Sequence, residues 1–519
     1  MNAVCCSRRV WWMAAAGVVV AIGGGALFLR EALTPPPTSL PSTPTYSVVE
    51  ATSEEVHEVC GACHTYPPAD SFPRHLWRHE VKRGFDFLRQ SRFDIPYPSS
   101  ESVALYYEKR APVELPVPEP TYAPGPCPAR FETTSWHLPG ENKVPAVSNV
   151  NIVHLSDAKQ PEVLVCDMRG NRVLALKPND PFNRWRVLGE VSYPAHAEVV
   201  DLDGDGIKDI LVACLGSFYP TDDKVGSVVW LKGEADGTFT PITLLDGIGR
   251  VADVQAADFR KCGKLDLVVA EFGWLKTGEV LYLENRTTDW SRPNFVPRVV
   301  DDRHGAIHVP VGDIDGDGNL DFVALISQEH ETIVAFLGRG DGTFRKETIW
   351  AGPHPAYGSS GIQLVDLNGD KKLDVLYTNG DVLDTSEFLK PYQGVQWLEN
   401  RGVFPFTHHP LAVMPGAHRA VAADIDGDGD LDVIAVSLLP DRKGRSLDSI
   451  ILLEQTAPGT FVRHSLEKDS CDHITCAAGD LYGDGRAHFI IGDFVPMKNR
   501  PLSGAVRLWK NLGRANHLR

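Results

Sequence analysis

Positive charge is in short supply in this chain. The sequence has 51 lysine and arginine residues against 68 aspartate and glutamate residues, and its formal net charge is −17. A protein that binds a nucleic-acid backbone needs the opposite balance, so this composition argues against nucleic acid as a partner. Much of the acidity falls in short loops whose bound cations would offset it, so the charge says little about other partners.

Several catalytic motifs are also missing. The sequence contains no nucleophile elbow, no phosphate-binding loop and no HExxH zinc motif. These absences remove the familiar signatures of α/β-hydrolases, P-loop enzymes and zinc proteases. No reaction class can therefore be read from a motif.

What the chain has instead is a repeat. The segment DLDGDGIKDILVA is followed by five related segments, two nearly intact (DIDGDGNLDFVAL and DIDGDGDLDVIAV), one lightly altered and two worn. Self-similarity at a near-constant spacing is the signature of a repeat architecture. The six copies, which we call loops one to six, begin at Asp201, Asp258, Asp313, Asp366, Asp424 and Asp480.

The intact loops are ladders of carboxylates. Oxygen ligands at loop positions 1, 3, 5 and 9, with a glycine at position 6 for the sharp turn, suit a hard cation such as Ca²⁺. A helix–loop–helix calcium site would need glutamate at position 12, where loop one has Val212. The apolar run after position 9 has β character, so each loop should join two strands. The predicted calcium ligands are Asp201, Asp203, Asp205, Asp209, Asp313, Asp315, Asp317, Asp321, Asp366, Asn368, Asp370, Asp374, Asp424, Asp426, Asp428 and Asp432.

Two loops have lost part of the ladder. Arg260 and Cys262 replace carboxylates in loop two, and Tyr482 and His488 replace them in loop six. In loop four, Lys371 takes the glycine position. We therefore expect Ca²⁺ in loops one, three, four and five, with loop four the weakest, and none in loops two and six.

The rest of each repeat predicts four strands. A small-residue strand precedes each loop, an apolar strand follows it, and a third strand has a recurring pattern. Four strands repeated at roughly 40–60 residues are typical of propeller blades. The third strand occurs seven times, as RVLALK from Arg172, SVVWLK from Ser227, EVLYLEN from Glu279, TIVAFLG from Thr332, GVQWLEN from Gly394, SIILLEQ from Ser449 and AVRLWKN from Ala505.

These loops resemble the FG-GAP, or VCBS, repeats of integrin-like β-propellers and of many exported bacterial proteins. The resemblance covers about residues 128–515 and implies an all-β, seven-bladed β-propeller. The first blade, with HLSDAKQPEVLV from His154, keeps its strands but lacks the carboxylates. The last blade has three strands of its own, and RFETTSWHL from Arg130 reads like a fourth strand. We expect this segment to close the ring and leave no open sheet edge.

A second motif, CGACH, occupies residues 60–64. Two cysteines at this spacing can form thioether bonds to heme, and the adjacent histidine can ligate iron, so Cys60, Cys63 and His64 are predicted to hold a covalent heme c. A local disulfide or half of a zinc site is the alternative, although no second cysteine pair stands nearby. Three candidate helices surround the motif, and the group resembles a small class I cytochrome c. They run over about 52–60, 72–90 and from 99 onward.

The second axial ligand of such a heme is an open question. Cytochromes of this type commonly use methionine, and none lies between Met13 and Met168. His75 and His79 are the local candidates, or else solvated helix residues. The whole layout, including the segment 377–400, resembles a group of exported bacterial VCBS-repeat proteins, which implies an architecture and not a reaction.

The N-terminal region predicts export. Residues 10–29 carry no charge, and about 20 apolar residues suffice to span a bilayer. Arg8 and Arg9 precede them, which favours a cytoplasmic N-terminus and an extracytoplasmic remainder, periplasmic or at the cell surface. A cleaved signal peptide is the alternative. The predicted organisation is a signal anchor or transmembrane helix at 1–33, a Pro-rich linker at 34–49, the cytochrome c-like module at 50–115, a second Pro-rich linker at 116–127 and the propeller at 128–515.

The positions of the remaining cysteines favour buried packing residues over disulfide bonds. Cys166, Cys214 and Cys262 lie in or near blade strands and are predicted to be buried. Cys471 and Cys476 could form a disulfide bridge.

Acidic loops between first and second strands should all lie on one face of a propeller, so a functional groove is expected on the opposite face. The first strands begin on that face, and four histidines lie near their starts. These histidines would reach the central channel and form a metal or substrate site, or else they are unrelated polar residues. Two loops on that face are further candidates for a sugar or protein partner, or for plain packing. The histidines are His196, His308, His418 and His473, and the loop residues are Asn379, Asp381, Asp384, Lys390 and Tyr392 in 377–393, with Tyr219, Asp222 and Asp223 in 216–226.

Three functions remain open from the sequence. The leading hypothesis is a membrane-anchored, extracytoplasmic, calcium-binding propeller with a c-type heme module, which binds a protein or glycan partner or transfers electrons to a redox partner. The second is a propeller enzyme of the lyase or dehydratase type that acts on carbohydrate. The third is a structural or adhesive module with a vestigial heme motif.

Overall fold

The computed structural model describes residues 48–62, 64–90, 96–140, 144–156, 159–383, 388–496 and 504–514. Contacts divide the chain into two units, Met1–Val49 and Glu50–Arg519. The predicted anchor at 10–29 and Cys63 lie outside the described residues. Of the helices in the described part, none combines the length and apolar character that a membrane span requires.

In the part of the chain that the structure describes, three α-helices precede the strands: α1 (Ser53–Cys60), α2 (Trp77–Gln90) and α3 (Ser100–Arg110). A capping box starts α1, in which the Thr52 side chain accepts the Glu55 N–H and the Glu55 carboxylate accepts the Thr52 N–H. The second helix starts later than predicted, because extended Pro73 is followed by a short 3₁₀ turn, η2 (Arg74–Leu76). Another such turn is η1 (Ala69–Ser71).

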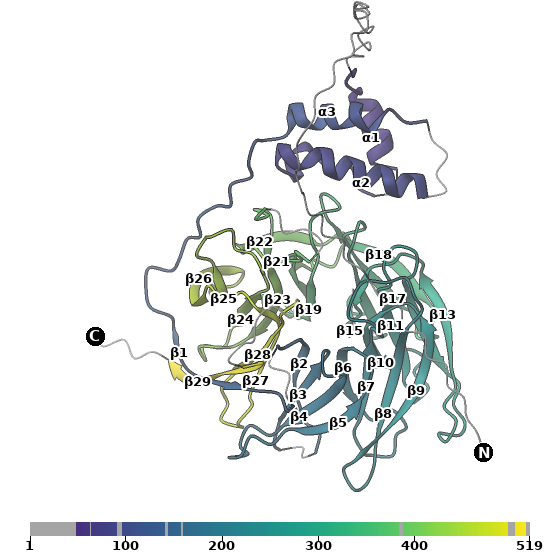
Figure 1. The fold of residues 1–519 in the computed structure, drawn as a ribbon. Helices are drawn as coiled ribbons and strands as arrows, with labels where there is room; N and C mark the ends of the chain where they lie inside the picture. Colours follow the sequence, from purple (N-terminus) through teal and green to yellow (C-terminus); the bar gives the residue numbers. More distant parts are fainter. Residues whose placement is uncertain are drawn as a thin grey trace, which may run out of the picture. The chain divides into compact units, whose positions relative to one another are not determined.

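Seven antiparallel sheets follow, arranged around a ring (Figure 1). Blade 1 contains β2 (Val147–Val153), β3 (Glu162–Asp167), β4 (Arg172–Leu176) and β5 (Arg186–Glu190). Blade 2 contains β6 (Pro194–Val200), β7 (Asp209–Cys214), β8 (Gly226–Gly233) and β9 (Phe239–Ile248). Blade 3 contains β10 (Val251–Ala257), β11 (Asp266–Glu271), β12 (Glu279–Asn285) and β13 (Phe295–Asp301).

Blade 4 contains β14 (Ala306–His308), β15 (Val311–Gly312), β16 (Asp321–Ile326), β17 (Thr332–Gly338) and β18 (Phe344–Ala351). Its first strand is divided in two at Pro310, which has no N–H for the ladder. Blade 5 contains β19 (Gly361–Val365), β20 (Asp374–Thr378), β21 (Gly394–Glu399) and β22 (Thr407–Val413). Blade 6 contains β23 (Ala417–Ala423), β24 (Asp432–Ser437), β25 (Asp448–Ala457) and β26 (Thr460–Lys468).

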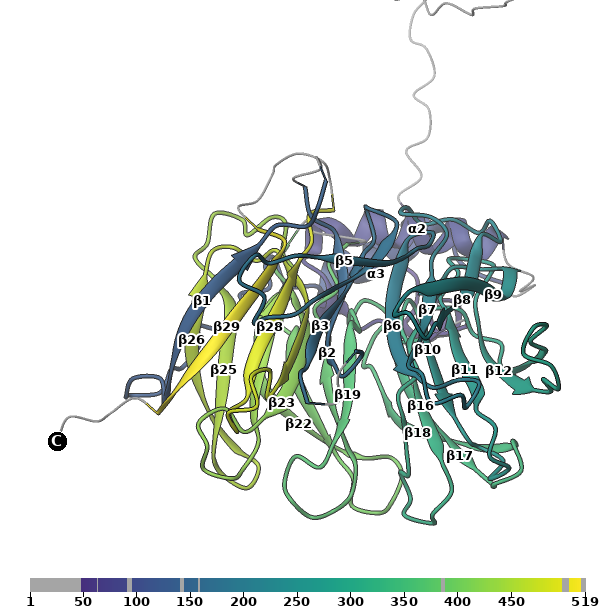
Figure 2. The ribbon, with the colours of Figure 1, turned by 90° about the horizontal axis from the view of Figure 1, so that it is seen from below.

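Blade 7 closes the ring as the sequence predicted. It contains β27 (His473–Gly479), β28 (His488–Asp493) and β29 (Val506–Arg514), and its fourth strand is β1 (Ala129–Trp136) from the other end of the propeller. The pairing of β1 with β29 is antiparallel, with Thr133 opposite Trp509. The described sheets therefore show the predicted seven-bladed β-propeller, and Figure 2 shows β1 lying against β29.

The position of a strand within its blade determines how far it is buried. Each second strand is buried along its whole length, as in β7 and β16, because neighbouring blades cover both of its faces. Fourth strands are largely exposed at the rim, as in β9. First strands of neighbouring blades contact one another, so they line the centre of the ring. Each of the six acidic loops joins a first strand to a second strand, so all six lie at the same end of the ring.

The cysteines differ in part from expectation. Cys166 and Cys214 are buried as predicted, whereas Cys262 is exposed because it stands in loop two and not in a strand. Cys471 and Cys476 are both buried but free, so the possible disulfide is not formed.

Candidate calcium loops and a polar cluster at the ring centre

Loop three shows how the acidic loops fold. Both oxygens of Asp313 accept backbone N–H groups, from Gly316 at 2.8 Å and from Gly318 at 3.0 Å. These glycines have positive φ angles of 76° and 83°, a conformation that strains other residues. The first carboxylate thus folds the loop around itself and turns the next acidic side chains toward it.

Three loops gather carboxylates closely enough to share an ion. In loops one, three and five, oxygens of the aspartates at positions 1, 3 and 9 all lie within 4.8 Å of one another. The position 5 aspartates stand outside these groups, as does loop four among the described residues. The three groups are Asp201, Asp203 and Asp209; Asp313, Asp315 and Asp321; and Asp424, Asp426 and Asp432.

The aspartate at position 9 also accepts hydrogen bonds from two backbone N–H groups, which the sequence did not predict. In loop three, Asp321 accepts the Ile314 N–H at 2.8 Å and the N–H of Gly338, at the end of the third strand, at 2.7 Å. It therefore ties the loop to two strands of its blade. The same paired contacts recur at Asp209, Asp374 and Asp432.

The loops differ in how much of their negative charge is already compensated. In loop one, Oδ1 of Asp201 is buried without a hydrogen bond, but Lys232 makes ion pairs with Asp203 and Asp205. In loop five, Arg514 lies 3.4 Å from Asp426. No lysine or arginine makes an ion pair with loop three in the part of the chain that the structure describes. Loop three is therefore the least compensated of the three groups.

Burial raises the pKa values of two aspartates at position 9, and repulsion from nearby carboxylates adds to the shift. Burial, with added repulsion from Asp426, raises the pKa of Asp432 to about 7, although three backbone N–H groups act against the shift. Burial likewise raises the pKa of Asp321 to about 6. A bound divalent cation would favour the ionised forms. The donor sets of loops one, three and five consequently fit Ca²⁺, which takes oxygen ligands.

In loops two and six, a basic side chain lies among the remaining carboxylates. In loop two, the guanidinium of Arg260 forms a bidentate pair with Asp266, at 2.8 and 2.9 Å, and so occupies the inner side of the loop with its own positive charge. In loop six, His488 at position 9 accepts the Asn511 N–H at 2.9 Å and lies 3.2 Å from Asp484. Asp480, Asp484 and His488 form a further group with metal-binding spacing, which the sequence analysis did not predict because the histidine breaks the ladder.

The face opposite the loops brings two of the four predicted histidines together. Nδ1 of His196 in β6 lies 2.7 Å from Asp253 of β10, and Nδ1 of His308 in β14 lies 3.7 Å from the same carboxylate. Nη1 of Arg419 in β23 lies 3.5 Å from Nε2 of His308 and donates to the Ile362 carbonyl at 2.8 Å. We call His196, Asp253, His308 and Arg419 the axial cluster, because first strands of four blades supply it.

Asp253 and Arg419 were not among the predicted site residues. The signal was present, since each is a charged residue inside a strand of small and apolar residues, VADVQAA and AHRAVAA. Conversely, His418 makes no ion pair with Asp253 among the described residues, and burial, with repulsion from His308, lowers its pKa to about 4. His473 is fully buried between Asp493 and Glu467 and belongs to a separate ion-pair network.

The ionisable side chains of the axial cluster have pKa values shifted in different directions. Burial favours the neutral acid of Asp253, but the two histidines outweigh it and hold its pKa well below the usual range. Burial disfavours the charged form of His196, yet Asp253 raises its pKa, whereas burial lowers that of His308. The cluster thus combines a carboxylate, one readily protonated imidazole, one neutral imidazole and a guanidinium. Such a set can bind a polar ligand or exchange a proton with it.

The long candidate loops are mainly internal structure. Asn379 and Lys390 are buried, and the Lys390 ammonium donates to the carbonyls of Ala356 at 3.3 Å and Asp381 at 3.4 Å. Tyr392 stacks on Tyr357, with ring centroids 5.8 Å apart. Asp384 lies outside the described residues.

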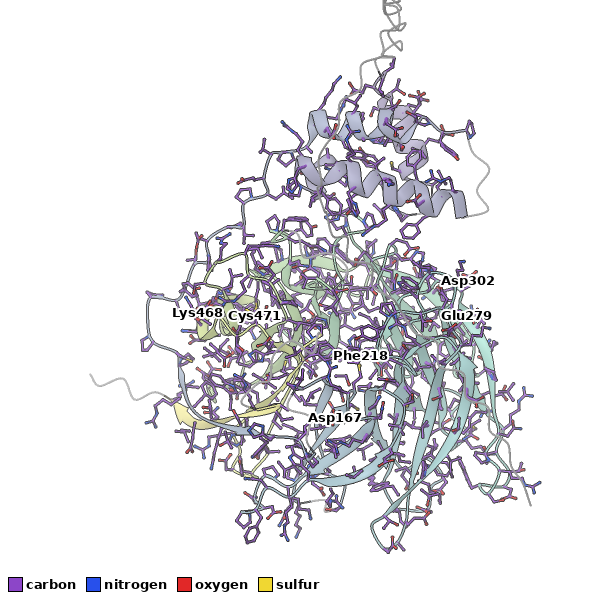
Figure 3. The ribbon with its side chains drawn as sticks, viewed as in Figure 1. Asp167, Phe218, Glu279, Asp302, Lys468 and Cys471 are labelled. Carbon is purple, nitrogen blue, oxygen red and sulfur yellow. The ribbon has the colours of Figure 1, made fainter. Side chains whose placement is uncertain are left out.

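The loop 216–226 joins neighbouring blades. The Asp222 carboxylate accepts N–H groups of Leu275, Lys276 and Thr277, so it fixes the turn of the next blade, while Asp223 makes no such contact among the described residues. Tyr219 is 69% exposed. Phe218 lies near the centre of the ring (Figure 3) and stacks on Phe494 of blade 7 at 5.9 Å.

The CGACH residues lie at the end of α1. Cys60 is half-buried beside Tyr107, and burial raises the pKa of its thiol to about 11. Nδ1 of His64 lies 2.9 Å from the Thr65 carbonyl, a contact that fixes the ring and leaves Nε2 free for a metal. His75 and His79, the predicted candidates for the second axial ligand of the heme, are both exposed.

Comparison with protein-family models finds the FG-GAP-like repeat at residues 201–269 and 313–377. These two ranges contain loops one to four with their second strands. Among curated proteins, none matches the chain. The repeat match and the closed ring of seven sheets describe the same architecture. The described part of the chain is therefore a seven-bladed β-propeller that carries FG-GAP-like repeats at residues 201–269 and 313–377.

Proposed function

We propose that this chain is an extracytoplasmic calcium-binding propeller that serves as a binding scaffold and is tethered to the membrane by its N-terminal segment. The observation that carries the calcium proposal is the convergence of three carboxylates in each of loops one, three and five. Loop four, with Asp366, Asn368, Asp370 and Asp374, is proposed as a weaker site. The tether rests on the uncharged segment 10–29 and on the arginines that precede it.

Calcium removal tests the first part. A ligand that binds only the folded state stabilises it by about 2.7 kcal/mol per site at 100 times its Kd, so chelation should lower the melting temperature of the full chain. Asp315→Asn in loop three should remove about one bound Ca²⁺ by equilibrium dialysis. Asp341→Asn, in an exposed turn of blade 4, is the matched control and should bind as much as the wild type. A wild-type protein that binds no Ca²⁺ and melts equally in chelator contradicts the proposal.

The axial cluster is the proposed ligand site of this scaffold. Its carboxylate, imidazoles and guanidinium suit a hydroxyl-rich ligand such as a glycan. On a glycan array, Asp253→Asn should lose binding that the wild type and Asp341→Asn retain. Turnover of a bound glycan that survives Cys60→Ala but not His308→Ala would instead assign the chain to the carbohydrate-acting enzymes.

Covalent heme c at Cys60 and Cys63, with His64 as an axial ligand, is the second proposed function. It is favoured by the free Nε2 of His64 and by the half-buried Cys60 at the end of α1. Heme would supply one-electron transfer to a redox partner. After co-expression with heme-maturation proteins, the full chain should keep heme-dependent peroxidase staining on a denaturing gel, and Cys63→Ser should weaken it. Unstained wild-type protein would remove the electron-transfer role and leave the calcium-binding scaffold unaffected.

A further inference from the structure

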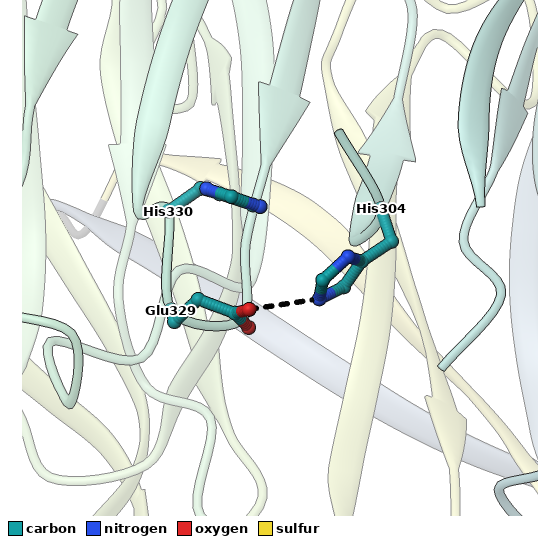
Figure 4. A group of neighbouring side chains, drawn as sticks. All are labelled: His304, Glu329 and His330. Carbon is teal, nitrogen blue, oxygen red and sulfur yellow. Dashed lines mark ion pairs between the residues drawn. The ribbon is translucent and has the colours of Figure 1, made fainter. Parts of the chain in front are cut away.

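A group of metal-ligating side chains lies outside every acidic loop. His304 stands between β13 and β14, and Glu329 and His330 stand in the turn between β16 and β17 of blade 4. One ring nitrogen from each histidine and one Glu329 oxygen all lie within 4.8 Å of one another. Nε2 of His304 and Oε1 of Glu329 form an ion pair, which Figure 4 marks with a dashed line, at 3.0 Å, and the two imidazole centroids are 5.1 Å apart.

These turns lie at the end of the ring opposite the acidic loops, because they join fourth to first strands and second to third strands. The group is therefore separate from the proposed calcium sites. It is also separate from the axial cluster, whose residues lie within the first strands.

The donor types differ from those of the acidic loops. Two imidazole nitrogens and one carboxylate form a borderline donor set, which suits Zn²⁺ and its transition-metal neighbours better than Ca²⁺. In a tetrahedral site with bonds of about 2.0–2.1 Å, the donor atoms stand about 3.4 Å apart. Small side-chain movements would bring the present three donors to that spacing.

His304 points to the same conclusion. Its Nε2 is buried and makes no well-directed hydrogen bond, although the Glu329 oxygen lies 3.0 Å away. A buried polar nitrogen without a hydrogen bond is a group that a bound ion would satisfy. These two side chains remain partly accessible, since that of His304 is 18% exposed and that of Glu329 is 33% exposed.

A cavity lies beside this group. It has a volume of about 340 Å³ and is lined in part by Glu279, Asp302 and Gly278. Gly278 packs so tightly on His304 that a Cβ there would lie 2.7 Å from the His304 Cβ. Figure 3 labels Glu279 and Asp302 at this side of the ring.

We propose that His304, Glu329 and His330 bind one divalent transition-metal ion of the zinc class, with the remaining coordination position open to water. Sites with three protein ligands and one open position are typical of zinc centres that polarise a bound molecule. The cavity lined in part by Gly278 and Asp302, which has both polar and apolar walls, is where such a molecule would enter.

Zinc titration of the full chain tests the proposal. Metal-depleted protein is titrated with Zn²⁺ by calorimetry in millimolar Ca²⁺, which keeps the acidic loops saturated. We expect His304→Gln, His330→Gln and Glu329→Gln each to lose one Zn²⁺ that the wild type binds, or to bind it at least about 100-fold more weakly. Loss of an outer-shell partner typically costs only 10–100-fold, so a ligand should exceed that range.

His409→Gln is the matched control. His409 also forms an ion pair with a glutamate, Glu399, at 2.9 Å, and its removal should leave the Zn²⁺ stoichiometry and affinity unchanged. Melting curves in Ca²⁺ check that every variant is folded, and the near-isosteric Glu329→Gln keeps the test valid should a histidine variant unfold. Equal Zn²⁺ stoichiometry and affinity in the wild type and in the folded ligand variants would overturn the proposal.

Discussion

His473 permits a quantitative prediction about pH. It was a candidate for the central site, but it is fully buried in blade 7, with Nδ1 2.7 Å from Asp493 and Nε2 3.1 Å from Glu467. Burial disfavours its imidazolium, yet the two carboxylates outweigh burial and raise the pKa from 6.5 to about 9. We therefore expect a buried, protonated histidine that stabilises the fold at neutral pH.

The sign and size follow from linkage. A group whose folded-state pKa is raised contributes its full stability below the unfolded pKa and loses it as pH rises through the folded pKa. The shift from 6.5 to about 9 corresponds to about 3 kcal/mol. The free energy of unfolding of the wild type, relative to His473→Gln, should thus fall by about 3 kcal/mol between pH 6 and pH 10.

Urea unfolding in saturating Ca²⁺, followed by tryptophan fluorescence at several pH values, measures this difference. The variant should fold, because Arg507 still pairs with Asp493 at 3.0 Å and with Glu467 at 3.2 Å. His409→Gln removes a more exposed histidine–glutamate pair, worth about 0–1 kcal/mol, and should show no comparable pH dependence. A difference between wild type and His473→Gln that is flat from pH 6 to pH 10 would refute the reasoning.

Three further predictions concern the ring. A chain that starts at Gly140 lacks β1, exposes the edge of β29 and should aggregate, whereas one that starts at Pro126 should stay soluble; equal solubility by size-exclusion chromatography would show that β1 is dispensable. Arg260→Gln leaves the fully buried Asp266 without its cation and should cost about 3 kcal/mol in urea unfolding, equally with and without chelator, whereas a smaller loss in Ca²⁺ than in chelator would mean that the ion binds loop two in place of the guanidinium. Asp222→Asn should make the turn at 275–277 more accessible to protease without changing Ca²⁺ binding, and unchanged cleavage would contradict its role.

The repeats show how one loop geometry tolerates different charges. Loop three leaves its carboxylates without an ion-pair partner among the described residues, loop one pairs two of them with Lys232, and loop two places Arg260 against Asp266. The position 9 side chain meanwhile still accepts the N–H at the end of the third strand, even where His488 replaces aspartate. The hydrogen bond from position 9 to the third strand is thus kept in loops whose charges differ.

The sequence alone determined the architecture. Loops, second strands and third strands are local patterns that recur in register, so their number predicted the blades, and the resemblance of 130–138 to other fourth strands predicted the closure between β1 and β29. The convergence of carboxylates in loops one, three and five was predictable for the same reason, since these side chains lie within nine consecutive residues. Helix α2 was placed too early, because the proline-bounded turn before it is not visible in an apolar pattern.

Only the tertiary structure decided which side chains meet across blades. Asp253 joins His196 and His308 because three first strands converge at the ring centre, and the strand spacing that sets these contacts is not encoded in any one segment. His473 resembled the other histidines in position, yet carboxylates on neighbouring strands made it a buried ion-pair partner. His304 meets Glu329 and His330 from a separate turn, which no local pattern could indicate. Local periodicity fixes strands and loops, whereas a site made by distant segments depends on how the blades pack.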